Sequence, residues 1–170
     1  PPGPLSLRYD GYWRAFRILT LETRSVTAGR DYMLEVKMQT EGLLSLVPSW
    51  HWRTLSVGAV QDGLFVPRRV ETEGRFRSRA YRGTIDYLAS GDLEVMTEPA
   101  AAWQGYEPVP EALRRATVDP QTATLTLPRP IGSGEACAGT ERIFDGRLRY
   151  DLDYSDRGTE TVERARATLY

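Results

Sequence analysis

Apolar and polar residues alternate along most of the chain, and this period of two predicts β-strands. In residues 32–38 the even positions are Tyr32, Leu34, Val36 and Met38, and a similar alternation runs from Leu148 to Tyr154. Such strands bury one face and leave the other solvated. Less regular runs predict further strands at Leu5–Tyr9, Trp13–Val26, Trp50–Val60, Leu64–Thr72, Arg75–Arg82, Thr84–Leu88, Leu93–Thr97, Glu141–Phe144 and Thr159–Tyr170.

Short turn sequences separate these runs and predict hairpins between neighbours. Glycine and aspartate supply the positive φ angles that tight turns need. Gly74 is expected to mark one more turn. About ten strands would then follow one another as a meander. The other turn sequences are residues 28–31, 61–63, 90–92, 145–146 and 156–158.

The stretch from Glu98 to Gly134 departs from the strand pattern. Pro99, Pro108 and Pro110 interrupt strand pairing. Residues 110–115 and 120–127 each begin with proline or an acid, which suits the first turn of a helix. We expect this stretch to cross the sheet and cover one of its faces.

A long antiparallel meander with little helix can hide its apolar face only by curling. The predicted fold is therefore all-β, a mainly antiparallel meander curled into a barrel, half-barrel or β-spiral, with one or two short helices in residues 110–128. Residues 1–170 form a single domain. So many strands enclose more space than side chains fill, which predicts a cavity or a plug. The interior candidates are Trp13, Phe16, Leu43, Leu44, Leu46, Val47, Trp50, Trp52, Trp103 and Tyr106.

The amino-acid composition excludes several kinds of metal and redox site. The only histidine is His51 and the only cysteine is Cys137, which excludes a two-histidine zinc site, a CxxC redox pair and a disulfide within the chain. A histidine between two tryptophans is more often structural than catalytic. Nucleotide-binding and hydrolase motifs are missing, so we expect no catalytic residue, no metal and no cofactor. The net charge of −1 gives no general attraction to nucleic acid.

Two charged stretches allow a functional and a structural explanation. The first could form an arginine ladder that holds phosphate, but acids paired with arginines across two strands explain it more simply. The second, Asp145 with Asp151, Asp153 and Asp156, lacks the spacing of a calcium loop. We expect both to be solvated strand faces. The first stretch consists of Arg69, Glu71, Glu73, Arg75, Arg77 and Arg79.

The connection from Gly42 to Trp52 is unusually apolar for a segment between two strands. Such a segment either folds inward as a lid on the core or forms a hydrophobic gate at the mouth of a cavity. The sequence leaves both open.

Three segments carry a resemblance to a known family. Residues 108–120, residues 137–140 and the run from Ile143 to Leu152 resemble the proteobacterial exported-protein family catalogued as domain of unknown function 3108. The resemblance implies a periplasmic envelope protein with a curved β-sheet, similar to β-spiral and lipoprotein-carrier half-barrel proteins, and no established catalytic residues. It further implies that the signal peptide, the final C-terminal strand and the disulfide partner of Cys137 lie outside the 170 residues.

Two functions from different classes remain open. In the first, a non-enzymatic periplasmic protein binds a lipid, an acyl chain or a lipoprotein segment in its concave apolar face, with peripheral contact to a membrane but no transmembrane segment. In the second, a structural or adaptor domain binds an envelope protein through a strand edge or an apolar loop. The residues predicted to bind a ligand are Leu43, Leu44, Trp50, Trp52, Arg53, Trp103 and Tyr106.

Overall fold

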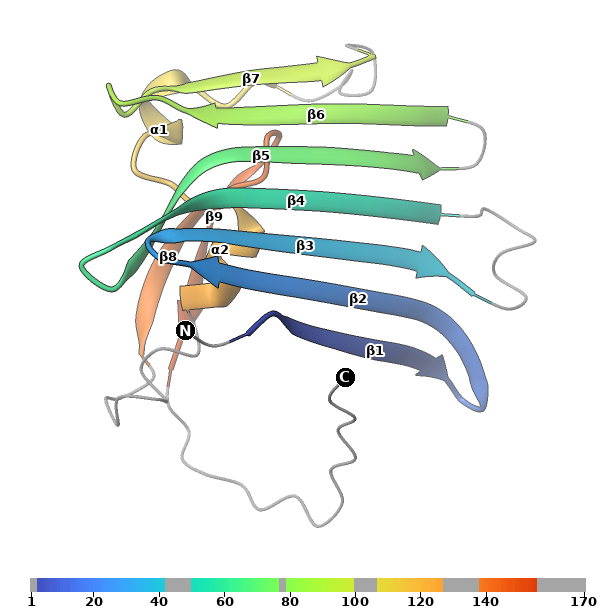
Figure 1. Ribbon diagram of the computed structural model, residues 1–170. Helices are drawn as coiled ribbons and strands as arrows, with labels where there is room; N and C mark the ends of the chain where they lie inside the picture. The colour runs from blue at the N-terminus through green and yellow to red at the C-terminus, as the bar shows by residue number, and fades with distance from the viewer. Residues whose placement is uncertain (1–2, 42–49, 77–78, 100–106, 127–137, 156–170) are drawn as a thin grey trace.

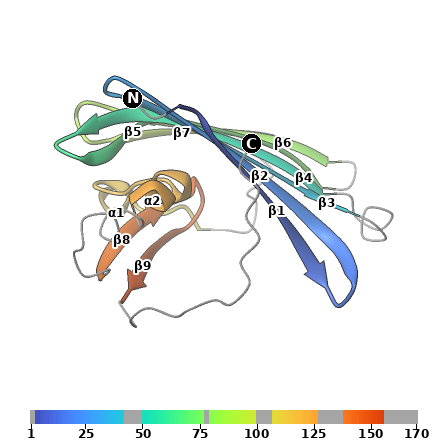
Figure 2. The ribbon, with the colours of Figure 1, turned by 60° about the horizontal axis from the view of Figure 1, so that its bottom comes forward.

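A curved sheet of seven antiparallel strands dominates the molecule (Figures 1 and 2). The computed structural model describes residues 3–41, 50–76, 79–99, 107–126 and 138–155. Each strand pairs with the next along the chain, so the order in the sheet is the order in the sequence. The strands are β1 (Leu5–Trp13), β2 (Phe16–Ala28), β3 (Asp31–Thr40), β4 (Trp50–Gln61), β5 (Leu64–Phe76), β6 (Arg79–Tyr87) and β7 (Leu93–Glu98).

A smaller second layer lies beneath part of the concave face (Figure 2). It consists of α1 (Glu111–Arg114), α2 (Pro120–Thr126) and a hairpin of β8 (Gly139–Phe144) and β9 (Arg149–Tyr154). Helix α2 contacts β3 and β5 of the sheet and β8 of the hairpin. The predicted excursion across one face of the sheet is therefore confirmed, and so are both predicted helical segments.

The core lies between the two layers. Val70, Ile85 and Leu93 project from the sheet and pack with Phe144 of β8, which is 2% exposed. Burial of such side chains contributes roughly 1.5–3 kcal/mol each. Arg114 of α1 lies over the ring of Phe144, with 5.7 Å between the guanidinium carbon and the ring centroid. These contacts attach the second layer to β5–β7 in particular.

The predicted fold class is confirmed as an antiparallel meander with two short helices. The described meander has seven strands and not about ten, because the β8–β9 hairpin forms a separate sheet. Within the described residues the sheet is curved but not closed, since β1 pairs with β2 alone and β7 with β6 alone. Glycines with positive φ stand at the predicted turns, among them Gly29 (62°) and Gly91 (85°). The predicted strand at 159–170 and the turn at 156–158 lie outside the described residues.

Three predicted strand limits are wrong. Gly74 is no turn, because β5 runs through it and the ring of Tyr81 on β6 occupies the space where a Cβ would stand. Gly83 likewise lies inside β6, which merges two predicted strands. At the other end, the predicted strand Trp13–Val26 contains a turn at Arg14, which has a φ of 55° without any glycine to signal it.

Two of the interior candidates are also wrong. Trp13 and Phe16 are 61% and 58% exposed, respectively. They face each other across the β1–β2 turn, at the tip of a hairpin (Figure 1). An alternating pattern identifies a strand, but it cannot show which part of the strand extends beyond the second layer and is therefore exposed to solvent.

Ion pairs cover the outer face of the sheet. Arg53 contacts Glu35 at 2.6 Å and Glu73 at 3.2 Å, and Arg69 contacts Asp86 at 2.8 Å. The acids stand beside arginines, as the structural explanation of the charged stretch predicted. Most of these side chains are at least a third exposed, so water and salt screen the pairs and each adds little to the stability of the fold.

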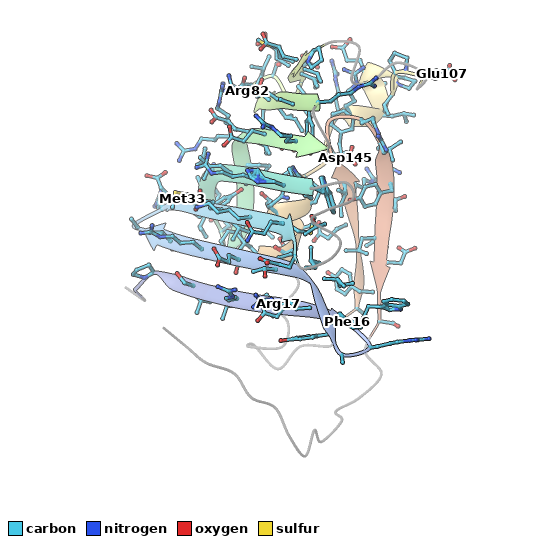
Figure 3. All side chains as sticks on the ribbon, turned by 90° about the vertical axis from the view of Figure 1, so that its right-hand side faces the viewer. Phe16, Arg17, Met33, Arg82, Glu107 and Asp145 are labelled. Atoms are coloured by element: carbon cyan, nitrogen blue, oxygen red, sulfur yellow. The ribbon has the colours of Figure 1, made fainter. Side chains whose placement is uncertain are left out.

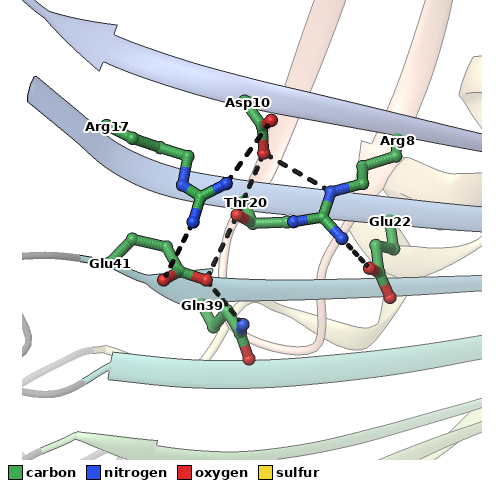
Figure 4. A network of polar contacts seen from close by, with 7 residues as sticks. All are labelled: Arg8, Asp10, Arg17, Thr20, Glu22, Gln39 and Glu41. Carbon is green, nitrogen blue, oxygen red and sulfur yellow. Dashed lines mark hydrogen bonds and ion pairs between the residues drawn. The ribbon is translucent and has the colours of Figure 1, made fainter. Parts of the chain in front are cut away.

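A further polar network covers β1–β3 on the same outer face (Figure 4). Arg8 lies 3.5 Å from Asp10, and Arg17 lies 3.8 Å from Asp10 and 3.9 Å from Glu41. Beneath them Thr20 is 2% exposed, with its hydroxyl oxygen 3.2 Å from a carboxylate oxygen of Asp10 and of Glu41. The outer face is thus a layer of mutually paired charges.

Candidate functional site: a cavity beneath the concave face

A cavity of about 400 Å³ lies between the concave face of β4–β7 and the second layer. This volume falls in the range of small-molecule sites. The N-terminus of α2 and the β8–β9 turn form its other side. Its principal lining residues are Trp50, Trp52, Val70, Thr72, Tyr81, Gly83, Ile85, Val95, Thr97, Gln121, Arg147 and Tyr150.

Aromatic side chains form one wall of the cavity. Trp50 and Trp52 stand two positions apart on β4 and therefore share a face; their rings stack with centroids 6.2 Å apart and planes 14° apart. The ring of Tyr81 lies across Gly74, where a Cβ would come within 2.4 Å of it. The indole N–H of Trp50 donates to the Tyr81 hydroxyl. Burial nevertheless raises the pKa of Tyr81 above its ordinary value.

Trp52 carries an unused donor. Its indole nitrogen is buried, and no described residue accepts a hydrogen bond from it. A buried polar group without a partner costs about 1–3 kcal/mol. The wall therefore has an apolar surface and one buried N–H that a ligand or a water molecule could satisfy.

The β8–β9 turn forms the opposite side. The Asp145 carboxylate accepts hydrogen bonds from the backbone N–H groups of Arg147 and Leu148, at 2.8 and 2.6 Å, which fixes the turn. Gly146 adopts a φ of 95° and approaches Ile85 closely enough that an added Cβ would lie 3.5 Å from its Cδ1 atom. Arg147 supplies the positive charge among the described lining residues. Figure 3 shows Asp145 at the end of this hairpin that faces the sheet.

Next to the cavity, a buried carboxylate holds α2 against the sheet. Asp119 is fully buried and precedes Pro120, the first residue of α2. Its Oδ1 accepts from the backbone N–H groups of Gln121 and Thr122, both at 3.0 Å, and so caps the helix. Its Oδ2 accepts from the hydroxyls of Thr122 at 2.5 Å and Ser56 at 3.1 Å.

This network extends to β3. The Tyr32 hydroxyl lies 2.6 Å from the Thr122 hydroxyl oxygen. If Tyr32 donates to Thr122, the Thr122 and Ser56 protons both point at Asp119, and every hydroxyl in the network is used. Burial raises the pKa of Asp119, and its four hydrogen bonds oppose that shift without cancelling it. Burial also raises the pKa of Tyr32.

A second hollow of about 820 Å³ lies at the other end of the concave face, near the β4–β5 and β6–β7 turns. Tyr87 lines it, with a buried hydroxyl that has no partner among the described residues. Burial raises the pKa of Tyr87 strongly, and the negative charge of Asp119 adds to the shift. Exposed turn residues such as Leu64 and Gly91 border this hollow.

The structure separates the residues predicted to bind a ligand. Trp50 and Trp52 line the cavity together. Arg53 does not belong to this set: it follows Trp52 in the strand, so its side chain lies on the outer face with Glu35 and Glu73. The residues outside the described part of the chain are Leu43, Leu44, Trp103, Tyr106 and the disulfide candidate Cys137, with the interior candidates Leu46 and Val47.

Several cavity residues were missed by sequence reasoning. Tyr81 was assigned to a charged stretch, although its register opposite Gly74 brings it to the two tryptophans. Asp119 was noted only as part of a family resemblance, although aspartate followed by proline is a signal for a helix start. Asp119 and Arg147 could not be placed without knowing that the second layer folds beneath the sheet.

His51, the only histidine of the chain, is exposed on the outer face, away from Ser56 and Asp119. The described residues contain no group of three or more His, Cys, Asp or Glu that could hold a metal ion. No helix within them is long and apolar enough to cross a membrane.

Comparison with known proteins adds no relative: no family model, curated protein or solved structure matches the chain. Function has to be argued from the site. The site defines a class of protein, a curved β-sheet with an apolar cavity between its concave face and a smaller layer.

Proposed function

We propose that this protein is a non-enzymatic component of the cell envelope that binds an apolar chain beneath Trp50 and Trp52. The chain would belong to a lipid, an acyl group or a lipoprotein segment. The periplasm is the compartment we propose, following the family resemblance of the sequence. The observation that carries the proposal is the cavity of about 400 Å³, which lies beneath the stacked tryptophans and beside the apolar core.

The lining favours an apolar ligand with a small polar end. Trp50, Trp52, Val95 and Ile85 offer apolar contact, whose burial contributes roughly 25 cal/mol per Å². Polar groups lie on both sides of the cavity: threonines and Tyr81 on the sheet, and Gln121, Asp145 and Arg147 on the second layer. Arg147 could contact an anionic end group there.

The decisive experiment is native mass spectrometry of protein exported to a periplasm and purified without detergent, followed by organic extraction. The expected result is a hydrophobic adduct at one molecule per chain. Trp50→Ala removes the stacked wall and should weaken retention roughly tenfold. Tyr9→Ala is the control, since it deletes an exposed aromatic ring that does not line the cavity and should leave the adduct unchanged.

Two results would overturn the proposal. One is a clean apo mass for well-folded wild-type protein that also fails to bind a fluorescent fatty acid. The other is an adduct that Trp50→Ala retains as well as the wild type does. Either result would shift weight to the second candidate.

That candidate is a structural or adaptor domain that binds an envelope protein by adding a strand. The observation in its favour is the open sheet, in which β1 and β7 each have one edge without a described partner. A pull-down with wild-type protein and with a variant carrying proline at an exposed residue of β7 outside the cavity lining, such as Glu94→Pro, tests it. Capture that is lost only in the edge variant would support strand addition.

A further inference from the structure

The β1–β2 hairpin ends in an exposed aromatic tip. Tyr12 and Trp13 are each 61% exposed and Phe16 is 58% exposed, although large aromatic side chains are usually covered. Trp13 and Phe16 face each other across the turn, and Tyr12 faces Arg17 in the next pair. Because neighbouring residues of a strand point to opposite sides, aromatic rings surround the tip on both sides. Figure 3 shows Phe16 and Arg17 at this end of the sheet.

The tip also carries positive charge. Residues 11–17 contain two arginines and no acid. Arg14 stands at the apex, 5.2 Å from the Trp13 ring centroid in a cation–π contact, and has no carboxylate partner among the described residues. Arg17 forms ion pairs with Asp10 and Glu41, at 3.8 and 3.9 Å, so Arg14 supplies the uncompensated charge of the tip. On the rest of the outer face, by contrast, arginines such as Arg53 and Arg69 are closely paired with acids.

The apex is conformationally expensive. Arg14 adopts a φ of 55°, a left-handed conformation that glycine adopts freely and arginine does not. Gly29, Gly63 and Gly91 adopt that conformation at other described turns of the sheet, and Asp62 adopts it beside Gly63, whereas the β1–β2 turn contains no glycine. Keeping arginine at such a position indicates a use for its side chain.

We propose that this aromatic and basic tip inserts into the surface of a membrane that contains anionic lipids. Tryptophan and tyrosine prefer the interface between water and hydrocarbon, and arginine at the same depth contacts lipid phosphates. Apolar groups on both sides of a narrow tip suit insertion into a fluid layer. A stable protein interface instead needs about 800 Å² on each partner, more than a two-residue turn and its flanks provide.

This inference does not depend on the proposed cavity function. A protein with an empty cavity could still dock, and one that carries a lipid could still lack membrane affinity. If both hold, docking brings the cavity-bearing sheet to the layer from which an apolar chain would come.

Vesicle flotation tests the proposal, with vesicles of phosphatidylcholine alone and of phosphatidylcholine mixed with phosphatidylglycerol. Wild-type protein should float with the anionic vesicles. The double variant Trp13→Ala/Phe16→Ala should bind them at least about tenfold more weakly, since it removes two exposed aromatic anchors. The matched control is Leu64→Ala, which shortens an exposed apolar residue at a hairpin tip on the other end of the sheet and should bind as the wild type does.

The variant Arg14→Gly tests the contribution of the Arg14 charge to vesicle binding without disturbing the fold. Glycine relieves the left-handed conformation, so the fold is kept, yet binding to anionic vesicles should fall roughly fivefold. Binding to phosphatidylcholine alone should not change. Trp50→Ala should bind vesicles normally, which distinguishes failure of docking from failure of the cavity.

Three outcomes would overturn the proposal. Folded wild-type protein would bind neither kind of vesicle, which would leave the tip for a protein partner. Alternatively, Trp13→Ala/Phe16→Ala would bind as tightly as the wild type, or Leu64→Ala would weaken binding as much as the tip variants do.

Discussion

Two neighbouring regions of the same concave face are built in opposite ways. Around Ser56 and Tyr32 the sheet meets α2 through hydroxyl and carboxylate groups that are buried and hydrogen-bonded. Around Trp50 and Trp52 the sheet presents large rings to a cavity and leaves one indole N–H unused. The first region attaches the second layer to the sheet, and the second region contains the cavity.

The contrast shows how a polar network and a cavity can depend on each other. Asp119 caps α2 and fixes it close to β3 and β4. The bulk of Trp50, Trp52 and Tyr81 occupies the face farther along the strands, beyond the reach of α2. The hydrogen bonds of Asp119 fix the distance between α2 and the sheet. They therefore also determine the width of the cavity beside α2.

The largest expected effect is on the polar region. Asp119→Ala removes the helix cap and leaves the Ser56 and Thr122 hydroxyls without their acceptor. We expect the free energy of unfolding to fall by about 3 kcal/mol, from the cap and the stranded hydroxyls together. Urea unfolding followed by circular dichroism measures it. Asp119→Asn, which can still cap α2, should cost clearly less; equal costs would show that the cap does not hold α2.

A matched pair of glycines compares the two regions directly. At Gly58 an added Cβ would lie 2.2 Å from the Val66 carbonyl oxygen and 2.5 Å from the Tyr32 ring, whereas at Gly83, in the cavity lining, the nearest atom lies at 3.6 Å. Gly58→Ala should therefore cost about 2 kcal/mol. Gly83→Ala should change stability by less than about 0.5 kcal/mol.

Thermal and urea unfolding of both glycine variants give the comparison. Similar costs at the two positions would contradict the distinction between a packed and a hollow region. A larger residue at Gly83, such as valine, extends the test because it fills the cavity: it should reduce retention of an apolar ligand while the protein stays folded.

Sequence reasoning predicted the local features of this fold and missed the ones that depend on distant contacts. Alternation placed β3 and β9, and turn residues placed Gly29, Gly91 and Gly146, because both signals are local. The turn at Arg14 contains no glycine and was missed. Gly74 was wrongly predicted as a turn, because its glycine is needed instead to leave space for the ring of Tyr81.

The candidate site was predicted only in part for the same reason. Trp50 and Trp52 could be assigned to an interior face, since they share parity on one strand. The same parity excludes Arg53, which the sequence analysis had nonetheless included. Asp119 acquires its partner Ser56, and Thr122 its partner Tyr32, from positions more than sixty residues away. No local pattern reports such contacts.

The pH dependence of the free energy of unfolding tests whether the folded-state pKa of Asp119 is raised. Burial raises its folded pKa above the unfolded value of about 3.9, so the folded state binds the proton more tightly. The extra stability is present below that unfolded value and is lost as pH rises through the folded pKa. The slope cannot exceed about 1.4 kcal/mol per pH unit. Unfolding of the wild type minus that of Asp119→Asn, measured across acidic pH, isolates this titration. A difference that grows with pH would mean that the hydrogen bonds prevail over burial.

The smallest expected effect is on the outer face, which belongs to neither region. Burial would raise the pKa of Glu35, but hydrogen bonds from Arg53 and Lys37 and their charges outweigh it and hold the pKa below its ordinary value. Here the stability is present above the unfolded pKa of about 4.3 and is lost as pH falls through the folded pKa.

Glu35→Gln should therefore cost less than about 1 kcal/mol at neutral pH, since Arg53 is 39% exposed and salt screens the pair. The cost should shrink in acid and at high salt, whereas the Asp119 contribution should grow in acid. Opposite signs for the two acids, measured in the same buffers, would separate a buried network from a surface ion pair. If both acids followed the same sign, Asp119 would be a carboxylate stabilised like Glu35, and its hydroxyl partners would outweigh its burial.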